Sequence, residues 1–143
     1  MPGDSAPAAP RVLVAKLHPQ ARLPEYPHPG DAGAELRAVT PQRIAPSGVA
    51  TISTGLAMAL PAGFAGLIIS AVADDSAQRP GSALPAVLDA GYRGEIVVHV
   101  LNRSATDAAL IEPGELLARL VIQPISQAQF LAAERLPGAA RTA

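Results

Sequence analysis

The stretch LDAGYRGEI, from Leu88 to Ile96, places one of the chain's two tyrosines on a glycine-rich turn between two apolar segments. Glycine suits such a turn because it adopts a positive φ at no steric cost, whereas a turn has no need of tyrosine. The acid Asp89 and the base Arg93 flank Tyr92. The combination indicates either side chains displayed to a ligand or a hairpin whose tyrosine caps the core, and these nine residues leave both interpretations open.

The segment after the turn, GEIVVHVLN, alternates in the manner of a β-strand. Both of its faces are largely apolar, which predicts a strand buried on both sides; one face would carry Ile96, Val98 and Val100, the other Val97, His99 and Leu101. Further apolar runs begin at Arg11, Val49, Gly63 and Gly114, and the Pro- and Gly-rich residues Pro24 to Gly33 predict a loop. Short strands separated by Gly, Pro and Asp turns predict an all-β sandwich or barrel of the jelly-roll kind.

The two ends of the chain differ from this pattern. Residues 1–10 are small and proline-rich and predict a flexible tail. The Ala, Gln and Glu content of Ile125 to Leu136 favours a short helix, with a terminal strand as the alternative. The expected organisation is therefore one β domain over residues 11–125, followed by a C-terminal segment and tail over 126–143.

The composition argues against several classes of function. With 143 residues, of which 49% are hydrophobic and 16% charged, the chain can form one domain with a sizeable core. A net charge of −1, no Trp, two Phe and two Tyr argue against a nucleic-acid groove. There is no cysteine for a disulfide or a thiolate site, and His18, His28 and His99 lack the spacing of a metal cluster.

The sequence gives no sign of export or of membrane insertion. Its N-terminus, MPGDSAPAAP, lacks the charged and apolar regions of a signal peptide. No run approaches the roughly 20 apolar residues of a membrane span. We therefore expect a cytoplasmic protein with no membrane partner.

Four features together resemble the trimeric deoxyuridine triphosphatase (dUTPase) family. They are DAGAEL from Asp31, AVLDAGYRGEI from Ala86, the strand end LN at Leu101 and Asn102, and GELLARLVIQP from Gly114. The resemblance covers residues 10–125, and LDAGYRGEI is its most specific element. It implies a distorted jelly-roll, a homotrimer with clefts between subunits, and magnesium-assisted hydrolysis of dUTP to dUMP and diphosphate.

The resemblance also assigns roles to the residues of the turn. Asp89 matches the acid that orients the attacking water, and Tyr92 matches the ring that packs under the deoxyribose. An aspartate accepts a proton from water, and a flat ring closes against a sugar that lacks a 2′-hydroxyl. Leu88, directly before Asp89, is expected to contact the same ligand.

Two of the family's motifs are missing. The second motif, Pro-Arg-Ser-Gly, falls where this chain reads SAVA, so that Ala71 and Val72 stand in place of groups that bind phosphate and would line a ligand cleft with small apolar groups. Asp74 and Asp75 follow as candidate acids or bases. The fifth motif, an arginine before a Gly-rich, Phe-containing arm, is absent from the tail LPGAARTA, although Arg135 and Arg141 are present.

The first and fourth motifs are altered. Glu35 replaces the usual aspartate of the first motif and could still hold metal-bound water. Leu116 and Arg119 replace the usual Arg and Gln of the fourth. Arg119 is a candidate phosphate contact, although an arginine at such a position is more often solvated or ion-paired. Arg79 is a second candidate.

These departures leave three functional interpretations. The first is a divergent protein with impaired or lost dUTP hydrolysis, whose inter-subunit cleft binds or transforms another small molecule. The second is an active magnesium-dependent dUTP or nucleoside triphosphate diphosphatase, in which Arg119, Arg79 or Arg135 compensates and Glu35 and Asp89 hold magnesium. The third is a non-catalytic trimer that contacts other proteins. The missing phosphate contacts favour the first interpretation.

Overall fold

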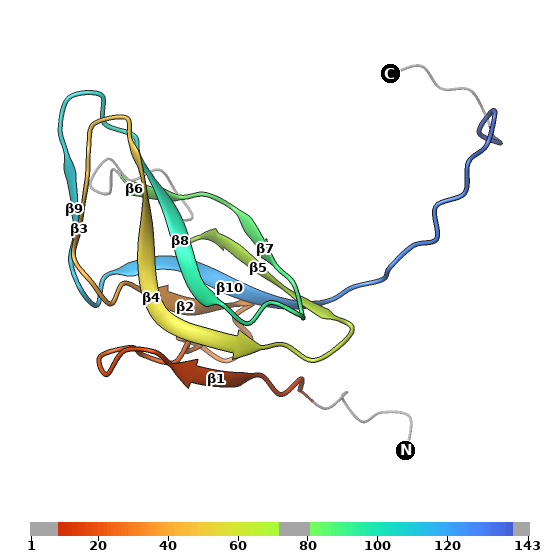
Figure 1. Ribbon diagram of the computed structural model, residues 1–143, viewed down its shortest axis with the longest axis horizontal. Coiled ribbons are helices and arrows are strands. Elements are labelled where there is room, and N and C mark those ends of the chain that lie inside the picture. The colour runs from red at the N-terminus through yellow and green to blue at the C-terminus, as the bar shows by residue number, and fades with distance from the viewer. Residues whose placement is uncertain (1–8, 72–80, 139–143) are drawn as a thin grey trace.

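The computed structural model describes residues 9–71 and 81–138, and ten strands form two facing sheets and a small ribbon. One sheet has the order β1-β4-β8-β6 and the other β2-β10-β5-β7, while β3 pairs with β9 (Figure 1). The strands are β1 Leu13–Lys16, β2 Gly33–Arg37, β3 Gln42–Ile44, β4 Val49–Ala59, β5 Phe64–Ser70, β6 Gly81–Ala83, β7 Ala86–Leu88, β8 Glu95–Asn102, β9 Ala109–Ile111 and β10 Leu116–Pro124.

The core fills the space between the two sheets. Its fully buried members include Ile52 and Leu56 of β4, Ile96 and Val98 of β8, and Leu36 of β2. Every strand pair is antiparallel, and the described residues contain no helix. The prediction of an all-β sandwich of the jelly-roll kind is confirmed, and no described element is a helix that could span a membrane.

The expectation that β8 is buried on both faces is wrong. Ile96, Val98 and Val100 are buried, but Val97 is only half-buried and His99 is exposed. The reason is that only one face of the β1-β4-β8-β6 sheet packs against the other sheet. On its outer face the ring of His99 lies 2.9 Å from the Thr51 hydroxyl of β4.

The expectation of a helix over residues 125–136 is also wrong, and no terminal strand replaces it. The segment is irregular and exposed, and in Figure 1 it runs away from the sheets beyond the end of β10. The Ile125 N–H donates to the Gly63 carbonyl, but Phe130 and Leu131 are 93% and 78% exposed. A short helix is marginal in water unless an apolar face packs against something, and the part of the chain that the structure describes gives this segment no such support.

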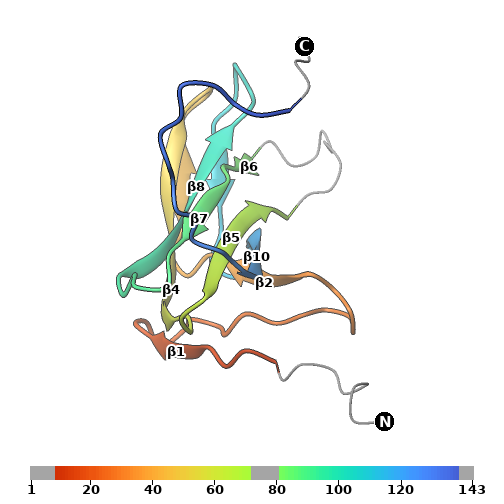
Figure 2. The same ribbon diagram turned by 90° about the vertical axis from the view of Figure 1, so that its right-hand side faces the viewer.

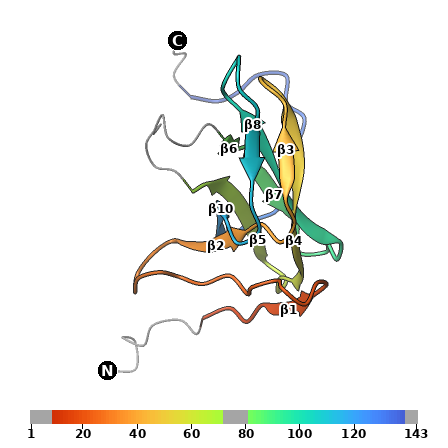
Figure 3. The same ribbon diagram turned by 90° about the vertical axis from the view of Figure 1, so that its left-hand side faces the viewer.

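Two loops lie at the two edges of the β2-β10-β5-β7 sheet. The loop that precedes β2, predicted from Pro24 to Gly33, extends past the sheets in both side views (Figures 2 and 3). Its residue Glu25 forms an isolated bridge with Glu35, so the start of the loop lies along the free edge of β2. The second loop is the turn between β7 and β8, which contains Asp89 to Gly94.

Candidate functional site

The turn from Asp89 to Gly94, here called the tyrosine turn, is held by its own atoms. The Tyr92 N–H donates to the Asp89 carbonyl at 3.1 Å, and the Tyr92 hydroxyl donates to the Glu95 carbonyl at 2.7 Å. Arg93 donates to the carbonyls of Ala90 and Tyr92. These contacts fix the tyrosine ring relative to the start of β8.

Glycine is needed in this turn for space, and the expectation of a positive φ is wrong. Neither Gly91 nor Gly94 has a positive φ. A Cβ added to Gly94 would lie 2.6 Å from the Tyr92 hydroxyl oxygen and 2.8 Å from Cζ, so the ring lies directly against this glycine. Tyr92 remains 43% exposed and can offer a flat surface to a ligand.

The carboxylate of Asp89 is exposed, and it forms no hydrogen bond or ion pair with the described residues. It therefore lies on the same short turn as a fixed aromatic ring, with its acceptor oxygens open to water. That arrangement suits a carboxylate that acts as a general base and accepts a proton from a water molecule bound next to a nucleoside.

Glu95 anchors the base of the turn, a role that the sequence did not indicate. Its carboxylate accepts from the Ser53 hydroxyl and, at 3.0 Å, from the Gly55 N–H. Both donors lie where the β4–β8 register shifts, between Ser53 and Leu56. The same glutamate thus joins the irregular part of β4 to the strand that carries the turn.

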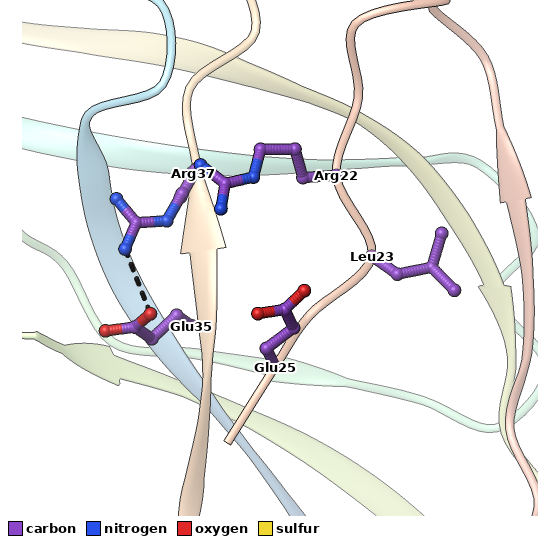
Figure 4. A pocket seen from close by; sticks show the side chains of 5 residues that line it. All are labelled: Arg22, Leu23, Glu25, Glu35 and Arg37. Carbon is purple, nitrogen blue, oxygen red and sulfur yellow. Dashed lines mark hydrogen bonds and ion pairs between the residues drawn. The ribbon is translucent and has the colours of Figure 1, made fainter. Parts of the chain in front are cut away.

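A second group of charged residues gathers where β2 and β10 pair, and we call it the β2–β10 corner. It consists of Arg22, Glu25, Glu35, Arg37 and Arg119. Arg37 donates to the Glu35 carboxylate at 3.0 Å and to the Gly114 carbonyl at 3.0 Å. Figure 4 shows this pair on β2, with Arg22 and Glu25 reaching toward it from the neighbouring loop. Together with Leu23 they line a polar cavity of about 10 Å³, which is room for about one water molecule.

Arg119 is the corner residue of the fourth motif, and, like those of Arg22 and Glu25, its side chain forms no ion pair with a described residue. It is the register partner of Glu35 across β2 and β10, yet no ion pair joins them. Instead the side chain leans over Gly33, where an added Cβ would lie 2.7 Å from Arg119 Cβ. Its Nε is buried and has no hydrogen-bond partner among the described residues. A buried donor left unpaired costs about 1–3 kcal/mol.

The tyrosine turn and the β2–β10 corner are separate within one chain. Arg119 pairs with Ile69 of β5, and the adjacent Ile68 pairs with Ala86, three residues before Asp89. Asp89 is therefore displaced from Arg119 by about four residues along the strand direction, which is about 13 Å. It is also two strands away across the sheet, which is about 10 Å. One copy does not bring the predicted acid and the predicted phosphate contact together.

The other predicted site residues lie in different surroundings. Leu88 and Ala71 are buried, 7% and 8% exposed, and Leu88 belongs to the core cluster. Val72, Asp74, Asp75 and Arg79 lie outside the described residues. The predicted roles of all six residues stay predictions.

The sequence interpretation missed three members of the corner. Arg37 could have been found, because residues two apart on a strand share a face and Glu35 was already a candidate. Arg22 and Glu25 gave no such signal, since only the bridge between Glu25 and Glu35 brings their loop to β2.

The described residues contain no cluster of three or more His, Asp or Glu that could cage a metal ion. Magnesium, however, commonly keeps several waters and needs only one or two carboxylates beside the phosphates of a substrate. Glu35 fits that role, because Arg37 engages only one of its carboxylate oxygens. The residues thus fit an ion that arrives with a triphosphate.

Comparison with known proteins gives a consistent result. A sequence model of the family described as dUTPase matches residues 19–142. The deoxyuridine 5′-triphosphate nucleotidohydrolase of Streptomyces coelicolor is 39% identical over 133 residues, which are 91% of this chain and 72% of that protein. The protein of the same name from Bifidobacterium longum is 41% identical over 140 residues, covering 94% and 87%.

Solved structures agree. A mutant dUTPase from phage phi11 of S. aureus, described as revealing the coordination of a structural Mg(II) ion, has a TM-score of 0.80 and 25% identity, and the alignment covers 87% of this chain and 97% of that one. The dUTPase of Staphylococcus bacteriophage 80alpha also scores 0.80 at 25% identity, with 90% and 99% covered.

The relatives overturn the first functional interpretation, that of a divergent protein with impaired dUTP hydrolysis and a different ligand. Identity of about 40% over more than nine tenths of the chain, to proteins named for that hydrolysis, favours the active alternative. The interpretation relied too heavily on the missing second and fifth motifs, and half of the segment SAVA, which replaces the second, lies outside the described residues.

Proposed function

Because this chain belongs to the dUTPase family, we propose that it hydrolyses dUTP to dUMP and diphosphate with the aid of magnesium, at a site completed by other copies of itself. The observation that carries the proposal is the tyrosine turn. There an exposed carboxylate and a half-exposed aromatic ring, fixed by its hydroxyl, belong to one short turn.

The turn supplies the chemistry of the nucleoside end. The Tyr92 ring packs against the deoxyribose, and the Glu95 carbonyl and Gly94 keep it from turning away. Asp89 orients a water molecule and accepts its proton as the bond between dUMP and diphosphate breaks. Glu35 would hold magnesium through a bound water, and the ion would offset part of the phosphate charge when it arrives with the triphosphate.

A homotrimer follows from the same proposal. The tyrosine turn and the β2–β10 corner are too far apart in one copy to act on one nucleotide. Rotation about a shared axis can place the turn of one copy against the corner of the next, and closed symmetry repeats that arrangement in every interface. The ligand is a nucleotide, and no nucleic acid or membrane partner is needed.

The test is release of diphosphate from dUTP by the purified assembly, with and without magnesium, beside dCTP, dTTP and UTP. We expect turnover of dUTP that chelation abolishes. Asp89→Asn should lower kcat by roughly 10²- to 10⁴-fold, the usual contribution of a general base. Asp107→Asn is the matched control, because Asp107 is an exposed acid in the β8–β9 loop. A folded, assembled wild type that releases no diphosphate from dUTP would refute the proposal.

A further inference from the structure

The β4 strand is irregular beside the tyrosine turn. Its pairing with β8 shifts between Ser53 and Leu56, and only the first two residues of β8 pair with β4 beyond the shift. Bulges of this kind bend a strand and are frequent next to active sites, where they re-aim side chains. Two register pairs alone are a weak support for a turn, because the ends of paired strands open readily. The turn therefore depends on further contacts from β4.

Those contacts meet on Glu95, the first residue of β8. The Ser53 hydroxyl donates to its carboxylate, and the Gly55 N–H donates to the same carboxylate at 3.0 Å. The backbone carbonyl of Glu95 in turn accepts the hydrogen bond of the Tyr92 hydroxyl at 2.7 Å. A continuous set of contacts thus runs from the bulge of β4 through one residue to the tyrosine ring.

The bulge is a firm point from which to hold the ring, because distant parts of the chain fix it. The Leu17 N–H donates to the Gly55 carbonyl at 2.7 Å, and the Val39 N–H donates to the Ser53 carbonyl at 3.0 Å. Between them the buried Thr54 hydroxyl donates to a carbonyl of β8 at 2.5 Å. Gly55 has a φ of 70°, a conformation that favours glycine. The local geometry is therefore set by several elements and not by β4 alone.

We infer that Ser53, acting through Glu95, positions the Tyr92 ring and so sets the preference for deoxyribose over ribose, an inference that rests on the proposed hydrolysis of dUTP. A flat ring rejects a 2′-hydroxyl only while it stays in contact with the sugar, and a misplacement of about 1 Å is enough to alter such a fit. The ring is held by its hydroxyl, whose acceptor belongs to the residue that Ser53 holds. Ser53 acts on the substrate only through this ring, so it is a positioning residue.

The experiment measures kcat and KM for dUTP and UTP with magnesium present, and the affinities of dUMP and UMP by calorimetry. For Ser53→Ala, the ratio of kcat/KM values for dUTP and UTP should fall roughly 3- to 10-fold. This is less than a full hydrogen bond to a charged group, because the Gly55 N–H still holds Glu95. The kcat for dUTP should stay within about twofold, since Asp89 is not part of this set of contacts. Ser53→Thr keeps the hydroxyl and should restore the ratio.

A double-mutant cycle with Tyr92→Phe distinguishes positioning from a merely structural role. The phenylalanine has no hydroxyl to reach the Glu95 carbonyl, so Ser53→Ala should not lower the ratio further in that background. A structural role would instead lower the free energy of unfolding in both backgrounds and leave the ratio unchanged. Thr51→Val is the matched control, because the Thr51 hydroxyl also joins β4 to β8 but contacts His99. It should leave the ratio at the wild-type value.

The inference is overturned if Ser53→Ala keeps the wild-type ratio, or if it lowers the ratio equally with and without the Tyr92 hydroxyl. The binding measurements separate it from the proposed function. A wild type that releases no diphosphate from dUTP, yet prefers dUMP to UMP through Ser53, refutes the proposed function and leaves the positioning role standing. A wild type that hydrolyses dUTP, with a Ser53→Ala variant of equal selectivity, refutes only the positioning role. A wild type with neither hydrolysis nor a preference for dUMP refutes both.

Discussion

The tyrosine turn and the β2–β10 corner carry the two halves of the proposed site, and they are built in opposite ways. In the turn, most of the described contacts join residues at most three apart, and only the Glu95 carboxylate at its base reaches β4. In the corner, contacts join β2 to a loop about ten residues earlier and to a strand about eighty residues later. The side chains of Arg22, Glu25 and Arg119 form no ion pair with a described residue, and the Nε of Arg119 is also buried.

The difference concerns when each half becomes ready for its ligand. The hydrogen bonds of the turn are already formed in a single copy, so its conformational entropy is lost during folding and not when a ligand binds. In the corner the Nε of Arg119 is buried without a described hydrogen-bond partner, and the described ion pair, between Arg37 and Glu35, is partly exposed. We therefore expect variants in the turn to affect stability and sugar recognition, and variants in the corner to cause small changes in stability.

The strongest test of this contrast is Glu95→Ala at the base of the turn. The change leaves the Ser53 hydroxyl and the Gly55 N–H without their acceptor. Hydrogen bonds to a charged group are strong, so the free energy of unfolding should fall by about 2–3 kcal/mol. Glu95→Gln retains an acceptor oxygen and should lose about half as much. Urea unfolding measures both, and an unchanged midpoint for Glu95→Ala would show that the turn does not depend on this anchor.

A smaller effect on stability, with a clear effect on recognition, is expected for Gly94→Ala. The new Cβ would meet the Tyr92 hydroxyl at 2.6 Å, so the ring must rotate away and lose its bond to the Glu95 carbonyl. Because the ring is the end of a flexible, half-exposed side chain, the stability cost should be about 1 kcal/mol. The preference for dUTP over UTP should drop roughly tenfold, measured as the ratio of kcat/KM values.

Gly91→Ala is the matched control for this variant. An added Cβ there has nothing within 4 Å, and Gly91 has no positive φ. Its stability and its nucleotide preference should stay close to those of the wild type. Equal losses in the two variants would mean that the turn needs flexible backbone in general, rather than room for the tyrosine ring at one position.

The same contrast explains how much could be predicted from the sequence. The strands and the turn were predicted because alternation and turn chemistry are local. The outer face of β8 was not, because apolar side chains such as Val97 and Leu101 look the same whether another layer covers them or not. The helix expected after Ile125 failed because propensity alone does not stabilise a short segment without packing.

The candidate site divides in the same way. Asp89 and Tyr92 could be proposed because they belong to one continuous stretch. The corner could not, because no rule for a single sequence states that residue 35 pairs with residue 119 and also bridges residue 25. The roles of Gly33 and Gly94 as space for a neighbouring side chain were invisible for the same reason, since each depends on where another side chain lies.

The smallest effect is expected in the corner itself, for Arg37→Gln. The change removes the ion pair to Glu35, whose partners are 28% and 20% exposed, and leaves the carboxylates of Glu25 and Glu35 on adjacent backbone partners. Pairs of this kind contribute about 0.2–1 kcal/mol, so stability should fall by less than about 1 kcal/mol. The loss should shrink in high salt, because ions screen the repulsion that remains.

Adding Glu25→Gln to Arg37→Gln should restore part of this loss, because the double variant no longer holds two facing carboxylates. Unfolding in low and high salt measures both effects. If the loss were the same in low and high salt, or if the double variant recovered nothing, the carboxylates of Glu25 and Glu35 would not repel each other, and Arg37 would not be what holds the loop against β2.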